Sequence, residues 1–224
     1  MGVLSREKLH PRVPGCAAVA GRLIVFEGID GSGKSTALAA VAERLWQRGV
    51  QVATTREETA TERGAWVRRS IEEGLDPLTT TFLFLADRAE HVREIGAWRA
   101  EGRHVLCDRF LHSTLAYQAV TLADRFGDEA AAMAYLRSLH RPWCPEPDHV
   151  LLFRADPATC VARTAGRGAP PSPYEKAGFL ARVQDAYLRL AGEEPERFTV
   201  VDAERGADAV AEEALRVVGC GLGI

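Results

Sequence analysis

The stretch RLIVFEGIDGSGKST, residues 22–36, decides the fold. Residues 22–27 form an apolar run with β-branched side chains, which predicts a strand. The glycine-rich residues 28–33 follow, and residues 37–49 after them are apolar at helical spacing. The sequence therefore predicts a strand, a glycine loop and a helix in this order.

The glycine loop fits the pattern G-x-x-x-x-G-K-[ST], which is typical of loops that bind phosphate. Glycines allow successive backbone N–H groups to turn inward around phosphate oxygens at the positive end of the following helix. We expect Lys34 to reach the β- and γ-phosphates and Ser35 to offer its hydroxyl to Mg²⁺. The alternative, an ordinary glycine turn, is disfavoured by the predicted strand and helix on either side.

The charge balance limits the classes of partner. The chain has 224 residues, with 28 basic and 31 acidic side chains and a formal net charge of −3. This balance argues against a general electrostatic attraction to nucleic acid or to an anionic membrane. No stretch approaches the roughly 18 apolar residues of a membrane helix. The five cysteines are odd in number and lack CxxC spacing, so we expect reduced thiols in a cytoplasmic protein.

Further apolar runs at residues 50–55, 104–107, 149–153 and 198–201 alternate with helical stretches around 66–73 and 79–100. Strands separated by helices predict an α/β fold, a five-stranded parallel sheet with helices on both faces. We expect one domain over residues 21–224, after a flexible extension over residues 1–20. Proline and glycine predict loops at residues 142–147 and 166–173.

Charged residues follow three of the predicted strands. Arg56 follows the second, Asp108 and Arg109 the third, and Asp202 the fifth. Ligands of open parallel sheets bind beyond the carboxyl ends of the strands, so these residues are candidates for a second binding site. The alternatives are an ion pair for Asp108 and Arg109, a surface charge for Arg56, and a cap or turn for Asp202.

From about residue 22 to its end, the chain resembles the thymidylate kinases, which are P-loop nucleoside monophosphate kinases. The resemblance rests on these blocks: FEGIDGSGKST (26–36), TREE (55–58), FLFLADRAEH (82–91), DRFLHSTLAYQ (108–118), YEKAGFLARVQDAYLRLA (174–191) and VVDA (200–203). The resemblance implies a P-loop NTPase core in three α/β/α layers, a homodimer, ATP with Mg²⁺ as the phosphoryl donor, and dTMP as the acceptor.

The resemblance also implies roles on the donor side. Lys34, Asp108 and Arg109 would be catalytic, and Ser35 and Asp108 would serve the metal. A further arginine, Arg163 or Arg167, would come from a lid at about residues 163–176. The ATP-binding residues would be Gly28, Ile29, Asp30, Gly31, Ser32, Gly33, Lys34, Ser35 and Thr36.

On the acceptor side, the resemblance places Asp30 at the sugar 3′-hydroxyl and Arg56 and Arg109 on the acceptor phosphate. Tyr117 would sit where a 2′-hydroxyl would collide, which favours deoxyribose. Its alternative role is a structural hydroxyl.

The base would be held by one helix and by the block that follows the third strand. Phe84 would stack on the thymine ring, and Arg88, four residues later on the same helical face, would hydrogen-bond the base. Ser113 or Thr114, with Gln118, would complete base recognition. For Phe84 the alternative is a core aromatic residue.

Three stretches depart from the family pattern. Residues 56–60 read REETA where the family has REPGG, residues 172–175 read SPYE where it has DRxE, and Ala119 stands where glycine is usual. The alternatives are a paralogue for another nucleotide, a nucleoside kinase with Glu27 as base, and a nucleotide-binding protein with little transfer activity. A GTPase is disfavoured because no N-K-x-D motif occurs.

Overall fold

The computed structural model describes residues 20–165 and 176–224, in which five parallel strands form a sheet in the order β2-β3-β1-β4-β5. The strands are β1 (Leu23–Glu27), β2 (Val52–Arg56), β3 (His104–Asp108), β4 (His149–Arg154) and β5 (Phe198–Asp202). Each predicted apolar run overlaps one of these strands, so the five-stranded parallel sheet is confirmed.

Helices connect the strands. They are α1 (Lys34–Gln47), α2 (Glu62–Glu72), α3 (Pro77–Ala100), α4 (Leu111–Phe126), α5 (Glu129–His140), α6 (Pro157–Ala165), α7 (Ala177–Glu193) and α8 (Ala207–Leu222). Local sequence explains several starts: the Asp76 side chain accepts a hydrogen bond from the Leu78 N–H, and Pro77 occupies the first turn of α3. Thr61 and Asp128 cap α2 and α5 in the same way.

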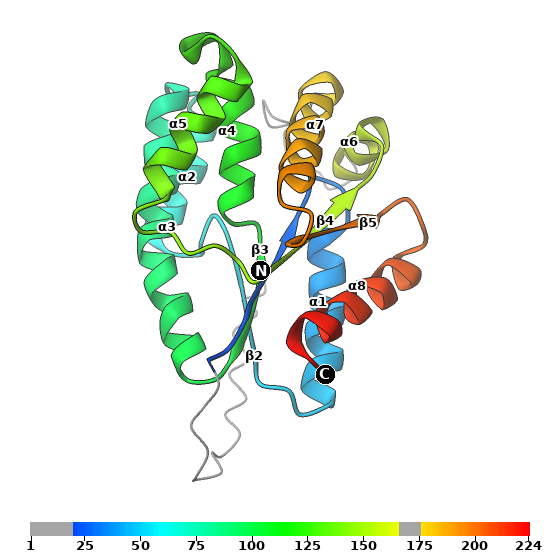
Figure 1. Ribbon diagram of the computed structural model, residues 1–224. Helices are drawn as coiled ribbons and strands as arrows, with labels where there is room; N and C mark the ends of the chain where they lie inside the picture. The colour runs from blue at the N-terminus through cyan, green and yellow to red at the C-terminus, as the bar shows by residue number, and fades with distance from the viewer. Residues whose placement is uncertain (1–19, 166–175) are drawn as a thin grey trace.

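Helices cover both faces of the sheet. α1 and α8 pack together on one face, and α3, α4 and α7 lie on the other (Figure 1). A parallel sheet covered on both sides needs apolar side chains in both directions. β1 meets this need, since its four apolar residues, from Leu23 to Phe26, are buried.

The strand order places the candidate site. β1 lies in the centre, with β3 on one side and β4 on the other. The chain therefore leaves β1 toward one edge and later crosses to the other, which opens a crevice beyond the carboxyl ends of these strands. The glycine loop follows β1 at this position, and Asp108 ends β3 beside it.

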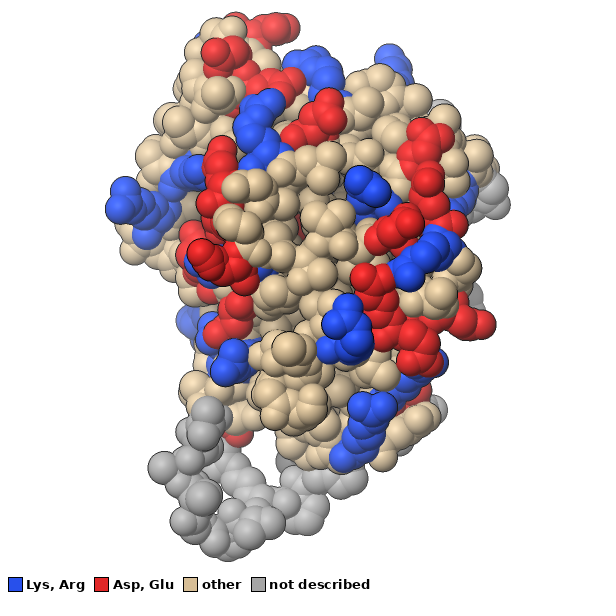
Figure 2. Space-filling view, turned by 45° about the vertical axis from the view of Figure 1, so that its right-hand side comes forward, with Lys and Arg blue, Asp and Glu red and all other residues tan. Residues whose placement is uncertain are grey.

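Several other predictions concern loops, charge and cysteines. Residues 142–147 lie outside the helices and strands, as expected. Cys107, Cys144, Cys160 and Cys220 are free thiols. On the face drawn in Figure 2, acidic and basic side chains are interspersed, in keeping with the near-neutral charge. None of the described helices is long and apolar enough to cross a membrane. The predicted extension (through residue 19) and most of the predicted lid (residues 166–175, with Arg167) lie outside the described residues.

Leu106→Ala tests the core of the sheet. Leu106 on β3 is fully buried, and its truncation should lower the free energy of unfolding by about 2–5 kcal/mol. Leu75→Ala is the control, because Leu75 is 43% exposed and should change stability by less than about 0.5 kcal/mol. Urea unfolding followed by circular dichroism measures both, and equal losses would contradict this assignment of the core.

Candidate active site

The backbone of the phosphate loop requires its glycines. Gly28, Gly31 and Gly33 have φ values of 143°, 85° and 88°, a region that other residues rarely adopt. A Cβ atom on Gly31 would lie 2.3 Å from the Cys160 carbonyl oxygen, and one on Gly28 would lie 2.6 Å from that of Phe153. α1 begins at Lys34, and Gly33 before it supplies no side-chain cap. The first N–H groups of α1 are therefore directed at the loop, where an anion can bind them.

Lys34 is buried beside this loop. Its ammonium nitrogen lies 3.8 Å from Oδ1 of Asp30. Burial and the nearby Arg109 lower the pKa of Lys34, while Asp30 and Asp108 oppose this shift. Although burial alone would raise it, the pKa of Asp30 is held well below its usual range by Arg109 and Lys34. The site thus keeps one carboxylate between two cations.

Ser35 and Asp108 form the part of the site that could hold a metal ion. The Ser35 hydroxyl donates to Oδ2 of Asp108. The other carboxylate oxygen of Asp108 is buried and has no hydrogen-bond partner among the described residues. A hydroxyl and an unpaired carboxylate oxygen are suitable ligands for Mg²⁺, which prefers oxygen. The two predicted metal residues are therefore adjacent.

Arg109, which follows β3, contacts several of the other candidate residues. It has a φ of 69°, and its guanidinium donates to Asp30 at 2.8 Å, to Ser113 at 3.0 Å and to Tyr117 at 3.2 Å. It also lies over the Tyr117 ring, 4.9 Å from the centroid. The Tyr117 hydroxyl donates in turn to Asp30 at 3.2 Å. The structure thus brings together four residues that were predicted separately.

Glu27 orients Arg109 and its neighbours through hydrogen bonds to the start of α4 and to Tyr187. Its carboxylate is buried and accepts hydrogen bonds from the Phe110 and Ser113 N–H groups at 2.9 and 3.0 Å, and from the hydroxyls of Ser113 and Tyr187 at 2.6 and 2.9 Å. Burial raises the pKa of Glu27, and the hydrogen bond from Ser113 and the charge of Arg109 oppose the rise. Both oxygens are occupied by structural contacts, which disfavours Glu27 as a base.

A buried ion pair joins α3 to the segment after β2. Arg88 donates through Nε and Nη2 to Glu57, at 2.8 and 2.5 Å. His91 lies 3.0 Å from the same carboxylate. Burial would raise the pKa of Glu57, but Arg88 and His91 lower it. Asp87 accepts from the Thr59 N–H and hydroxyl at 2.8 and 2.6 Å, so α3 holds the REETA segment at both Glu57 and Thr59.

Two further contacts fix the orientation of Arg88. Nη2 also donates to the Phe110 carbonyl at 3.0 Å, and Nη1 lies 2.8 Å from Nε2 of His140. The His140 Nδ1 atom lies 2.7 Å from the Leu136 carbonyl, which can only accept. Nδ1 therefore carries the hydrogen and Nε2 accepts from Arg88. The pKa of His140 is lowered to about 4 by burial and by Arg88, so the ring is neutral at pH 7.

The other predicted residues lie around these clusters. Phe84 is partly buried, one turn before Arg88 on α3. Thr114 and Gln118 are buried on α4, and the Thr114 hydroxyl has no hydrogen-bond partner among the described residues. Arg56 is exposed at the end of β2, beside Asp108 in the register, and lies 3.9 Å from Glu58.

One of the two predicted lid arginines is described. Arg163, in the last turn of α6, donates to the carbonyl of Gly31 at 3.3 Å and to that of Ala203 at 3.4 Å. It therefore lies against the phosphate loop. Asp202, considered above as a cap or turn residue, accepts a hydrogen bond from the Glu204 N–H.

The sequence predictions assigned no role to five residues that build the site, and they considered Glu27 only as a base in the nucleoside kinase alternative. The spacing of Asp87 and His91 on one helical face was an available signal. His140 and Tyr187 carried no such signal. The five are Glu57, Asp87, His91, His140 and Tyr187.

Comparisons with known proteins point to one family. The family model described as thymidylate kinase matches residues 26–214. A probable thymidylate kinase of Methanosarcina mazei is 39% identical over 200 residues, covering 88% of this chain and 95% of the relative. Proteins of the same description from Natronomonas pharaonis (39% over 198 residues; 88% and 96%) and Methanoculleus marisnigri (42% over 182 residues; 81% and 86%) are also similar.

Glu57→Gln tests the buried pair. It leaves the Arg88 charge buried and unpaired, so we expect a loss of about 3–5 kcal/mol of stability at pH 7. The pKa of Glu57 lies below its ordinary value of 4.5 in the folded protein. The carboxylate therefore stabilises the fold fully above about pH 4.5 and less as the pH falls through the folded value.

The difference between wild type and Glu57→Gln in urea unfolding should accordingly shrink from pH 7 toward pH 3.5. Glu58→Gln is the matched control, because its arginine partners are partly exposed and the pairs contribute about 1 kcal/mol or less. A difference that grows toward low pH would contradict the assignment.

Proposed function

The chain belongs to the thymidylate kinase family and is a phosphotransferase, and we propose that it transfers the γ-phosphoryl group of ATP to dTMP, giving dTDP, through the residues described above. One observation carries the proposal: Arg109, Asp30 and Lys34 form a continuous network of charged groups at the phosphate loop. Arg109 is thus a second cation held next to Lys34. Two cations are needed here because the reaction brings together two negatively charged phosphate groups.

On the donor side, we expect the loop N–H groups and Lys34 to hold the ATP phosphates. Ser35 and Asp108 would hold Mg²⁺, which would neutralise charge on the β- and γ-phosphates when bound. Arg163 already lies against the loop through Gly31. It is the described candidate for the additional arginine on the γ-phosphoryl group.

On the acceptor side, Arg109 and Arg56 would bind the monophosphate. The acceptor oxygen is already anionic, so catalysis requires positioning and charge stabilisation rather than a general base. This requirement agrees with the contacts of Glu27, whose oxygens are both occupied. It also disfavours the alternative of a nucleoside kinase, which needs a free carboxylate base.

Base and sugar recognition would follow from the rigid Arg88. Four of its five N–H groups are bound to Glu57, Phe110 and His140. The remaining Nη1 hydrogen has no partner among the described residues, and it would bind a base that stacks on Phe84, with Thr114 and Gln118 completing the contacts. Ser113 acts through Glu27 and Arg109 and orients the site.

Tyr117 and Asp30 would face the sugar. Their mutual hydrogen bonds fix both side chains, so Tyr117 would sterically exclude a ribose 2′-hydroxyl.

We also propose a homodimer, since Trp66 on α2 and Phe82 on α3 are 50% and 47% exposed. The four free thiols support our proposal of a cytoplasmic location.

A panel of acceptors tests the proposed reaction. With ATP and Mg²⁺, ADP release should give the highest kcat/KM for dTMP among deoxynucleoside and ribonucleoside monophosphates, and thymidine should not react. Lys34→Ala should lower kcat at least about 100-fold, because it removes charge stabilisation of the transition state. Turnover of dTMP no faster than that of the poorest acceptor would refute the assignment. ATP binding without transfer would favour the nucleotide-binding alternative.

Arg88→Lys tests base recognition. It keeps the positive charge but loses the planar fork. We expect KM for dTMP to rise about 10- to 100-fold, and KM for ATP to change less than about twofold. Arg93→Lys is the control, because Arg93 lies on the same helix and is exposed. Circular dichroism verifies folding, and equal losses for both substrates would remove Arg88 from the base site.

A further inference from the structure

A cavity of about 730 Å³ lies apart from the phosphate loop, between α4, α5, the end of α7 and the segment that leads into β4. Its lining includes His112, Met133, Arg137, Glu146 and Glu194. The proposed ATP and Mg²⁺ residues do not line it. The cavity is therefore separate from the proposed ATP and Mg²⁺ site, while His140, which accepts a hydrogen bond from Arg88, lies in its lining.

His112 is the unusual residue of this cavity. Its side chain is fully buried at the start of α4 and packs edge-on against Phe198, with ring centroids 4.8 Å apart. Neither ring nitrogen has a hydrogen-bond partner among the described residues. Burial and the nearby arginines lower the pKa of His112 to about 3, so the ring is neutral and one nitrogen keeps a free lone pair. Buried polar groups normally have a partner, so this ring lacks one.

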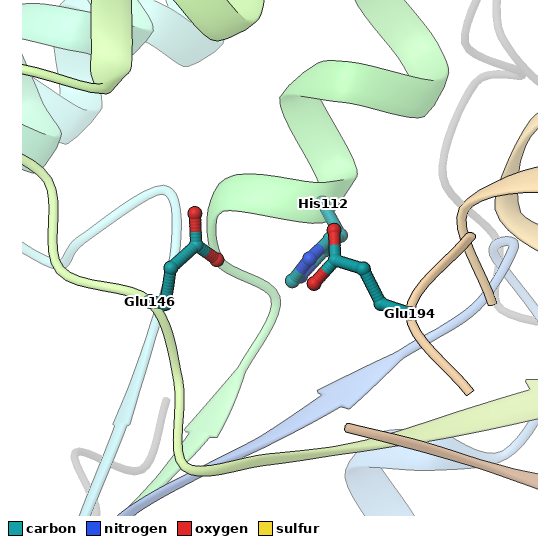
Figure 3. Close-up of side chains that lie close together, drawn as sticks. All are labelled: His112, Glu146 and Glu194. Carbon is teal, nitrogen blue, oxygen red and sulfur yellow. The ribbon is translucent and has the colours of Figure 1, made fainter. Parts of the chain in front are cut away.

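Two carboxylates approach the ring from different segments. Glu146 precedes β4 and Glu194 follows α7, and Figure 3 shows both side chains gathered with His112 at the first turn of α4. One ligand atom from each of the three residues lies within 4.8 Å of the other two. Arg197 donates to Glu194 at 2.8 Å and orients it. Partial burial and the Glu194 charge raise the pKa of Glu146, as expected when two carboxylates converge.

We propose that His112, Glu146 and Glu194 bind a divalent transition-metal ion of the zinc class. A neutral imidazole with two carboxylates is a suitable donor set for Zn²⁺, and a water molecule from the cavity would complete four-coordination. The imidazole nitrogen disfavours Mg²⁺ and Ca²⁺, which take oxygen ligands. The ion would supply the missing partner of His112 and offset the repulsion between the carboxylates.

The geometry requires a small adjustment. Ligand atoms about 2.1 Å from a tetrahedral zinc ion are about 3.4 Å apart, so the present group must contract. His112 is fixed by packing, whereas Glu146 is exposed and Glu194 partly exposed. The flexible glutamates can therefore move to the imidazole. The bound ion would join α4, the segment before β4 and the end of α7, which are far apart in the sequence.

Zn²⁺ binding to the full-length protein, stripped of metal and free of nucleotide, tests this proposal. Titration against a chromogenic chelator should show one equivalent whose affinity falls at least about 10-fold in Glu146→Gln and in Glu194→Gln. Glu193→Gln is the matched control: it lines the same cavity and pairs with Arg137, but lies outside the cluster. It should bind as wild type does.

Both test glutamates are at least partly exposed, so their replacement should not prevent folding even if His112→Asn does. Co²⁺ provides a second readout, since a tetrahedral nitrogen and oxygen site gives a visible absorption band that both Gln variants should lose. The proposal is overturned if wild type binds no Zn²⁺ at micromolar concentrations, or if the two Gln variants bind it as tightly as Glu193→Gln. Zinc at Cys220 or Asp108 would give this last result, because it would remain in every variant.

Discussion

The carboxylate of Glu27 ends the central strand without exposed surface, and a charge in that position needs compensating donors. It obtains them from the first turn of α4 and from Tyr187 on α7. These bonds determine where α4 starts relative to β1, and therefore where Arg109 meets Asp30. Arg109 and the phosphate loop are positioned together because Glu27, the residue before the loop, holds α4 and α7.

A second buried carboxylate organises the other side of the crevice. Glu57 holds Arg88 and His91, while Asp87 holds Thr59. The segment after β2 lacks the proline and glycines of the family pattern, yet both of its ends are attached to α3. Side-chain hydrogen bonds thus position a loop that is not shaped by the usual backbone residues.

The features that could be predicted from the sequence are those determined by contiguous residues. The strands, the phosphate loop and Lys34 follow from local patterns, and Arg109 followed from its place after β3. The contacts that orient these residues join positions far apart: Glu27 bonds Phe110 across 83 positions and Tyr187 across 160. Nothing local distinguishes Tyr187 or His140 from ordinary helix residues, and their parts could be found only from the tertiary structure. The roles of Arg56 and Phe84 in substrate binding stay predictions.

At the proposed base site, the commitment of four Arg88 N–H groups to protein partners has a consequence for how a base would be distinguished. A guanidinium group donates hydrogen bonds and cannot accept them. The four bonds of Arg88 to the protein also prevent the group from changing its orientation. A pyrimidine with a carbonyl at the contacted edge is complementary to the free hydrogen. A pyrimidine with an amino group at that edge would place its own N–H donor against the N–H donor of Arg88, and neither would form a hydrogen bond. Discrimination between thymine and cytosine would then depend on one fixed N–H group of Arg88, which can donate a hydrogen bond but cannot accept one.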